Sequence, residues 1–124
     1  MTTALWIAQI LLALANGFAG FMKTFRPIPD LAAMMKWPGD YPPALTRFVG
    51  IVELAAAVGL VLPVATGILP WLTPLAALGV AAIQVLAIGF HAMRGETKQT
   101  LIANLVLLAL ALFILWGYWP LFGL

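Results

Sequence analysis

Five polar side chains stand out because they lie within long apolar stretches of the chain: Asn16, Glu53, Gln84, His91 and Asn104. Ionisable groups are costly in hydrocarbon, so inside a membrane they usually face the interior of a helix bundle and take part in pairing or function. A carboxylate and an imidazole are also common proton-exchange groups. Glu53 and His91 are therefore the candidate catalytic residues.

The other candidates are binding groups. Side-chain amides both donate and accept hydrogen bonds, and cations near the end of a membrane helix attract anionic groups. The predicted ligand-binding residues are Asn16, Lys23, Arg47, Gln84 and Asn104. An ionised Glu53 inside the membrane needs a cationic partner such as Lys23, Arg47 or His91.

Each candidate also has a structural interpretation. Glu53 would fix the helix register through a salt bridge, and the amides would hold neighbouring helices together. His91 would lie at the membrane interface near the C-terminus of its helix, and the Lys and Arg side chains would set the topology. Both interpretations remain open from the sequence.

Composition excludes several other kinds of site. The chain has no Cys, which excludes disulfides, thiolate metal ligands and a CxxC redox motif. It has no Ser for a nucleophilic triad, and one His with one intramembrane carboxylate is too few for a zinc or iron site, so we predict no metal site. Haem would find only His91 as an axial ligand.

The elements that must position these residues are membrane helices. Of 124 residues, 65% are hydrophobic and 8% are charged, and the mean hydropathy is +1.10. A soluble domain carries about 25–35% charged residues on its surface. Six Lys and Arg in total cannot form a face for nucleic acid, so nucleic acid is excluded as a partner.

Four apolar segments are long enough for a hydrocarbon layer about 30 Å thick. Proline and threonine mark their limits. Pro43 suits a first helical turn, Pro63 is expected to end the second helix, Thr73 caps the third with Pro74 behind it, and Pro120 terminates the fourth. The predicted helices are residues 4–22, 43–62, 74–93 and 101–118.

The connections favour antiparallel neighbours, so the predicted fold is an all-α, integral membrane four-helix up-and-down bundle in one transmembrane domain, residues 1–124. The connection over residues 23–42 is long. Within it, residues 30–36 are expected to form a short interfacial helix followed by Trp37 at headgroup depth.

Charge predicts the orientation. One end of the bundle holds every basic residue: Lys23, Arg26, Lys36, Arg47, Arg94 and Lys98. The positive-inside rule places that end in the cytoplasm and both termini outside a cell (inner) membrane. An aromatic belt is expected at the other end, formed by Trp6, Trp71, Trp116, Tyr118 and Trp119. No Lys or Arg precedes the first apolar segment, which is interpreted as a helix and not a signal peptide.

Four strings carry a family resemblance: Gly20-Phe-Met-Lys23, Arg47-Phe-Val-Gly-Ile-Val-Glu53, Gly59-Leu-Val-Leu-Pro63, and Leu72-Thr-Pro-Leu-Ala-Ala-Leu78 leading to His91 and Arg94. The chain resembles the DoxX-like family of small four-helix membrane proteins. The resemblance implies a four-helix bundle with a characteristic glycine and acidic residue at Gly50 and Glu53 and a basic residue at Lys23. Some relatives are subunits of thiosulfate:quinone oxidoreductase or take part in membrane-associated thiol and oxidative-stress systems, and distant eukaryotic relatives are similar to assembly chaperones of ligand-gated channels.

Two classes of function remain. A redox-linked binder would hold a quinone or a similar amphiphile beside Glu53 and His91, with the electron donor on another membrane subunit. An assembly or interaction protein would dock a client subunit through Ala55, Gly59 or the proline-rich connection. A small-molecule carrier is the least favoured, because the bundle is narrow. A homodimer is also expected. For each of these functions the protein also contacts the lipid bilayer.

Overall fold

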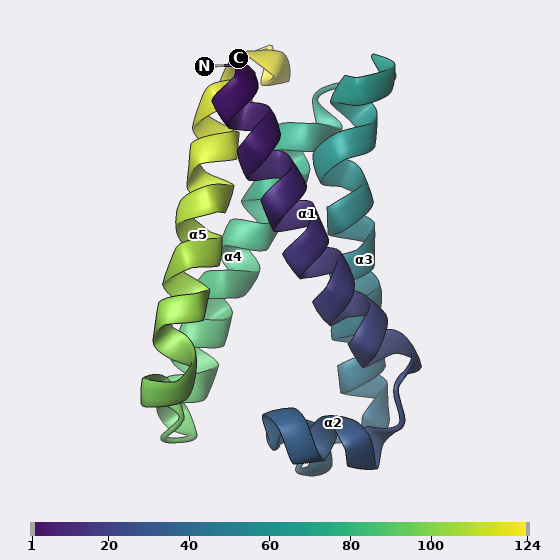
Figure 1. Ribbon diagram of the computed structural model, residues 1–124, viewed down its shortest axis with the longest axis vertical. Coiled ribbons are helices and arrows are strands. Elements are labelled where there is room, and N and C mark those ends of the chain that lie inside the picture. The colour runs from purple at the N-terminus through teal and green to yellow at the C-terminus, as the bar shows by residue number, and fades with distance from the viewer. Residues whose placement is uncertain (1, 124) are drawn as a thin grey trace.

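Helices make up nearly all of the computed structural model, which describes residues 2–123 apart from the side chain of Gln99 (Figure 1). The long helices are α1 (Thr2–Phe25), α3 (Pro43–Thr66), α4 (Leu72–Met93) and α5 (Thr97–Tyr118). A short helix, α2 (Ile28–Met35), and a 3-10 turn, η1 (Trp37–Gly39), connect α1 to α3, and a second turn, η2 (Trp119–Phe122), follows α5.

The long helices alternate in direction, so both ends of the described chain lie at one end of the bundle (Figure 1). Four helical spans are long and apolar enough to cross a membrane, the last of them from Thr100 to Phe122. The prediction of an all-α, up-and-down membrane bundle is confirmed. The breaker at Gly95 also acts as expected, because it follows α4 with a positive φ of 74°.

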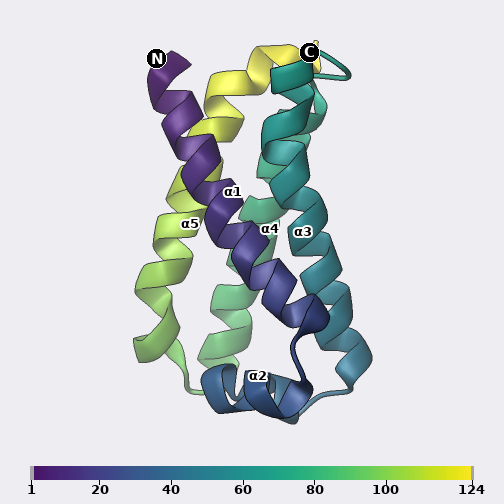
Figure 2. The same cartoon turned by 45° about the vertical axis from the view of Figure 1, so that its right-hand side comes forward.

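The bundle consists of two helix pairs, α1 with α3 and α4 with α5. The pairs join in the half nearest the chain ends, where small and branched side chains fill the core: Ala8, Leu12, Leu60, Ala77, Val80, Ala81, Ala111 and Ile114. Toward the other end the pairs diverge, and α2 crosses beneath them (Figure 2). The space left there is the setting of the candidate site.

Two glycines bring the backbones of α1 and α3 into contact. A Cβ atom on Gly50 would lie 2.7 Å from the backbone nitrogen of Thr24, and one on Gly20 would lie 2.8 Å from the carbonyl oxygen of Gly50. Real Cβ atoms do not approach backbone so closely. Only glycine at both positions allows this crossing, as in other closely packed membrane helices.

The prediction that Pro63 ends the second helix is wrong. Helix α3 continues through Pro63 to Thr66, and Gly67 closes it in the left-handed conformation at φ 74°. Proline has no N–H to donate to the carbonyl of Gly59, four residues earlier. The hydroxyl of Thr73 on α4 donates to that carbonyl instead, at 3.1 Å, so the helix continues without leaving a buried acceptor unpaired.

Thr73 therefore does not cap its own helix, contrary to expectation. Helix α4 begins at Leu72, with Trp71 at the N-cap position and no side-chain cap. Helix α5 also begins earlier than predicted, at Thr97 and not at residue 101, because hydropathy locates the apolar run whereas polar residues extend the helix beyond it. For the same reason α1 extends past the predicted range 4–22 at both ends.

The short connecting helix covers residues 28–35 and not 30–36, because Lys36 adopts a positive φ of 68°. Trp37 then turns inward. It is only 8% exposed and packs edge-on against Phe90 of α4, with 5.8 Å between the ring centroids. Trp37 is thus part of the bundle interior, and its expected place at headgroup depth stays a prediction.

A polar contact that sequence reasoning missed lies near the chain ends. Gln9 is fully buried, its Nε2 donates to the carbonyl of Leu60 at 2.7 Å, and its Oε1 accepts from the Tyr118 hydroxyl at 2.7 Å. Tyr118 was expected to belong to the aromatic belt at this end of the bundle. Its hydroxyl joins α5 to α1 inside the bundle.

Candidate functional site

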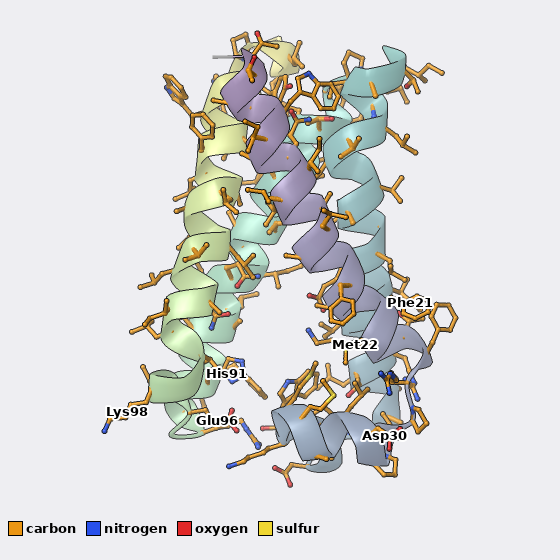
Figure 3. The ribbon with its side chains drawn as sticks, viewed as in Figure 1. Phe21, Met22, Asp30, His91, Glu96 and Lys98 are labelled. Carbon is orange, nitrogen blue, oxygen red and sulfur yellow. The ribbon has the colours of Figure 1, made fainter. Side chains whose placement is uncertain are left out.

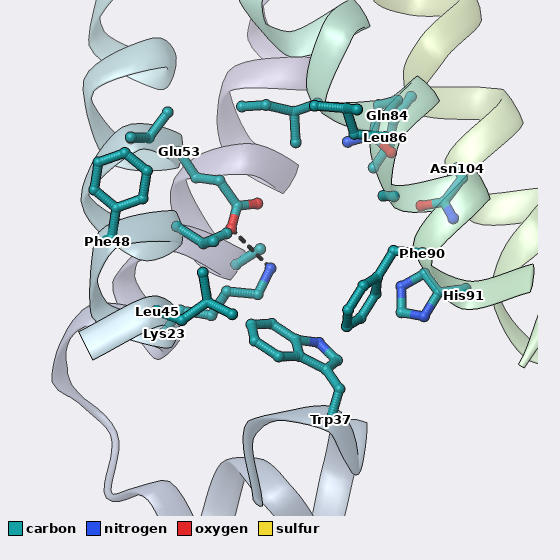
Figure 4. Close-up of a pocket in the computed structure, with 16 residues that line it drawn as sticks. Lys23, Trp37, Leu45, Phe48, Glu53, Gln84, Leu86, Phe90, His91 and Asn104 are labelled. Atoms are coloured by element: carbon teal, nitrogen blue, oxygen red, sulfur yellow. Dashed lines mark hydrogen bonds and ion pairs between the residues drawn. The ribbon is translucent and has the colours of Figure 1, made fainter. Parts of the chain in front are cut away.

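A cavity of about 430 Å³ lies where the two helix pairs diverge (Figure 4). Helices α3 and α4 form its sides, α1 and α5 contribute polar groups, and Trp37 forms its floor. The lining residues are Ala19, Lys23, Trp37, Leu45, Phe48, Val49, Val52, Glu53, Ile83, Gln84, Leu86, Ala87, Phe90, His91, Asn104 and Leu107. We call this cavity the membrane pocket.

The mouth of the membrane pocket faces the lipid. Phe48 on α3 is 65% exposed and Leu86 on α4 is 72% exposed, and both line the pocket. Exposed apolar side chains on membrane helices face acyl chains. The pocket therefore opens sideways, between α3 and α4, toward the apolar part of the bilayer.

An ion pair lies on the α1–α3 side of the membrane pocket. Nζ of Lys23 is 2.7 Å from Oε1 of Glu53, and both side chains are largely buried (Figure 4). The prediction that Glu53 has a cationic partner is confirmed, and that partner is Lys23. Pairing offsets the cost of placing a charge in hydrocarbon, and the close α1–α3 crossing makes the pairing possible.

Two of the predicted binding residues support this ion pair and do not line the membrane pocket. Nδ2 of Asn16 donates to the backbone carbonyl of Glu53 at 2.7 Å. Nη1 of Arg47 donates to the carbonyl of Lys23, in the last turn of α1, at 3.0 Å, and to that of Arg26, just after α1, at 2.6 Å. Asn16 thus joins α1 to α3, and Arg47 satisfies carbonyls that the helix end leaves unpaired.

Two buried amides on the opposite side have unpaired atoms. Gln84 is 4% exposed and Asn104 is 9% exposed, and both line the membrane pocket. Oε1 of Gln84 and Nδ2 of Asn104 have no hydrogen-bond partner in the described part of the chain. A buried polar atom without a partner costs about 1–3 kcal/mol. The two residues line the pocket, but the unpaired atoms themselves have almost no accessible surface, so a bound molecule pairs with them only after these side chains turn toward it.

His91 lines the same pocket and belongs to a charged cluster at the foot of α4 and α5 (Figure 3). Its Nδ1 lies 2.8 Å from Oε1 of Glu96, which also accepts from Nε of Arg94 at 3.2 Å. Nη2 of Arg94 donates to Asp40 at 2.7 Å, which ties the connection after η1 to the α4–α5 turn.

This cluster keeps its charges. The hydrogen bond with His91, and then the guanidinium of Arg94, hold the pKa of Glu96 below its ordinary value, although partial burial acts in the other direction. The carboxylates of Asp40 and Glu96 raise the pKa of Arg94. Glu96 is therefore an ionised acceptor for His91 at neutral pH.

Sequence reasoning missed Trp37, Phe90 and Glu96 as site residues. The signal for Glu96 was its place just after the Gly95 turn, which returns the chain toward the end of α4 and His91. No local signal marked Trp37, because the path of the connection below the bundle decides where its ring lies.

Comparison with known proteins gives the family. The model of the DoxX-like family matches residues 7–114, a range that includes most of all four membrane spans. The chain belongs to the DoxX-like family. No curated protein and no solved structure matches it. This DoxX-like protein is a multi-pass membrane protein, and three of its residues that carry the resemblance, Lys23, Gly50 and Glu53, meet at the α1–α3 crossing.

Proposed function

We propose that this DoxX-like protein binds a quinone-like amphiphile in the membrane pocket and serves as the quinone-binding subunit of a membrane redox system. One observation carries the proposal: an apolar cavity open toward lipid ends on two buried amides with unpaired atoms and a buried ion pair. Small-molecule sites commonly combine apolar walls with a few convergent polar groups, in volumes of roughly 300–1,000 Å³.

The position of the mouth favours a ligand that arrives from the bilayer. A lipid-soluble molecule diffuses laterally to the gap between α3 and α4 and slides its ring past Phe48 and Leu86. Its apolar tail stays in the hydrocarbon. A water-soluble ligand gains nothing from such a mouth, because it would have to cross the acyl region first.

The polar groups favour ring oxygens. A quinone carbonyl accepts from Nδ2 of Asn104, whereas a quinol hydroxyl donates to Oε1 of Gln84. Trp37 and Phe90 at the floor offer apolar aromatic surface against a flat ring. The amides are thus matched to both redox states of such a ligand, with the orientation of each amide set by the ligand.

Glu53 and His91 supply the proton chemistry in this proposal. Reduction of a quinone to a quinol takes up protons along with electrons, and the electrons come from a partner redox subunit in the same membrane. The carboxylate lies on the α3 side of the pocket and the imidazole on the α4 side, so a ring between them has an acid–base group at each edge.

The test uses the fluorescence of Trp37. A variant in which Trp6, Trp71, Trp116 and Trp119 are replaced by Phe retains one tryptophan, at the pocket floor. In nanodiscs, titration with a short-tailed quinone is expected to quench Trp37 saturably. Ala87→Phe fills the pocket and should abolish saturable quenching. Ala82→Phe, an exposed alanine on the same helix, is the control and should retain it. Linear quenching that is equal in all three proteins contradicts the proposal.

The alternatives receive less support. An assembly role was expected to use Ala55 or Gly59. Ala55 is exposed on α3, but a Cβ on Gly59 would lie 3.0 Å from Ala76, so α4 already covers that position. The proline-rich connection is folded beneath the bundle. A carrier needs a path through the membrane, and buried side chains fill the half near the chain ends. If the quenching test fails, co-purification of a client subunit is the outcome that would favour the assembly role.

We also propose that the end carrying α2 faces the cytoplasm of an inner membrane, since every Lys and Arg lies there. Both termini then lie outside. Epitope tags placed before residue 1 and after residue 124 should be labelled from the non-cytoplasmic side in intact cells. Labelling from the cytoplasmic side alone would reverse the assignment. The homodimer stays a prediction, to be tested by cross-linking in native membranes.

A further inference from the structure

A second cavity, of about 310 Å³, adjoins the membrane pocket at the foot of the bundle. It lies between the end of α1, the connecting helix α2 and the start of α5. Its lining is Lys23, Met34, Met35, Lys36, Trp37, His91, Glu96 and Thr100. Three of these side chains, Lys23, Trp37 and His91, also line the membrane pocket, so they form the partition between the two cavities.

The character of the second cavity differs from that of the membrane pocket. It has charged groups on several sides, and Met34 and Lys36 at its rim are exposed. It therefore opens at the basic end, where a membrane protein meets water and headgroups. Polar walls of this kind hold water.

The hydrogen bond between His91 and Glu96 fixes the tautomer of the imidazole. An ionised carboxylate accepts only, so Nδ1 of His91 carries the proton in the 2.8 Å contact. In the neutral ring Nε2 then has the free lone pair. The ring lies beside Phe90 at the edge of the membrane pocket (Figure 4), with Glu96 on its other side, toward the second cavity.

We propose that the second cavity is the aqueous proton inlet of the membrane pocket, and that Glu96 is a positioning residue that holds His91 with Nε2 as the base available to a bound ligand. This inference rests on the proposed function for the identity of the ligand. The inlet and the tautomer are properties of the protein alone, so they are measurable without a ligand.

The proton transfer between the ligand and His91 moves no electrons, so it needs no redox partner. The O–H bond of a ligand hydroxyl breaks, its electron pair stays on the ligand oxygen, and Nε2 of His91 gains the proton. The resulting imidazolium keeps its Nδ1–H bond to the carboxylate of Glu96, which stabilises the new charge. In quinone reduction the step runs in reverse: the Nε2–H bond of the imidazolium breaks, the reduced ligand oxygen gains the proton, and water in the inlet supplies the next proton to His91.

Charges around the imidazole come from every neighbouring element. Glu96 and Arg94 lie on the α4–α5 turn, Lys36 follows α2, and Asp40 follows η1. Across the partition lie Lys23 on α1 and Glu53 on α3, already paired with each other. The two lysines that line the inlet differ in their surroundings: Lys23 is paired with Glu53, whereas Lys36 lies at the exposed rim.

The tautomer is measured first. His91 is the sole histidine of the chain, so ¹⁵N-histidine labelling yields one imidazole spectrum. In nanodiscs, neutral His91 is expected as the Nδ1–H tautomer. Glu96→Gln, whose amide donates as well as accepts, should lose this preference, while Asp40→Asn, the matched control on the same cluster, should keep it. A wild-type protein in the Nε2–H tautomer overturns the positioning role of Glu96.

Access is measured as the rate at which the Nδ1 proton of His91, on the side of the second cavity, exchanges with water, followed by ¹H–¹⁵N NMR. Thr100→Phe fills the inlet and should slow this exchange severalfold. Ala103→Phe, at an exposed position three residues after Thr100 on α5, should leave the rate unchanged. Ala87→Phe, which fills the membrane pocket and not the inlet, should also leave it unchanged. Slowing by Ala87→Phe but not by Thr100→Phe overturns the inlet. Because neither measurement uses quinone, this failure is distinguishable from loss of saturable quenching of Trp37.

Discussion

Lys23, at the end of α1, and Glu53, within α3, form an ion pair with 2.7 Å between Nζ and Oε1 in a largely buried environment. The pair lies directly beside the crossing of Gly20 and Gly50, where the two backbones touch. Asn16 and Arg47 bind backbone carbonyls on either side of it. The charged wall of the membrane pocket therefore depends on how closely α1 and α3 pack.

Removal of one partner of this pair should destabilise the protein more than removal of both. Lys23→Met leaves a buried carboxylate and should cost about 3 kcal/mol. Glu53→Gln should cost less, because the long lysine side chain can extend toward the basic end. The double variant should recover most of the loss, measured by unfolding in mixed detergent micelles. Additive single effects would show that the two charges do not interact.

Gly50→Ala should separate α1 from α3. The added methyl meets backbone atoms of Lys23 and Thr24, which cannot move aside independently, so overpacking should cost about 1–3 kcal/mol. Gly79→Ala is the matched control on α4, where nothing lies within 4 Å, and it should stabilise its helix by up to about 1 kcal/mol. Thermal unfolding of both variants decides the point; equal effects would contradict the close crossing.

The hydroxyl of Thr73 should matter only while Pro63 is present. Thr73→Val leaves the carbonyl of Gly59 unpaired and should cost about 1–2 kcal/mol. In a Pro63→Ala background the new backbone N–H can bond that carbonyl, so the same Thr73→Val change should cost much less. A double-mutant cycle measures this coupling. An unchanged penalty in the alanine background would refute the explanation given for the continuous α3.

Acid should weaken the cluster that holds the connection below the bundle. The pKa of Glu96 is lowered in the folded protein, so its contribution to stability is complete above the ordinary glutamate pKa and is lost as the pH falls through the lowered value. Arg94, with a raised pKa, stays charged throughout. Unfolding measured from pH 7 down to strongly acidic pH should show this decline, and Glu96→Gln should flatten it. An identical acid profile in both proteins would assign the decline to other carboxylates.

The sequence by itself determined the class of protein, the four membrane helices and their alternating direction. It also identified Asn16, Glu53, Gln84 and Asn104 as residues of the bundle interior, and all four are buried. These features are local, because the cost of a polar group in hydrocarbon acts on each helix separately. Apolar length and the spacing of polar residues along one helix are sufficient to recognise them.

Tertiary structure decided which residues meet. Glu53 had three candidate cations, and only the packing of α1 against α3 selected Lys23, which is 30 positions away. Pro63 was expected to end a helix because its missing N–H is visible in the sequence, whereas the hydroxyl of Thr73 that compensates comes from the next helix. The inward turn of Trp37 and the two adjoining cavities also arise from the divergence of the helix pairs. Such contacts join segments that are far apart in the sequence, so the pattern of residues along one helix cannot predict them.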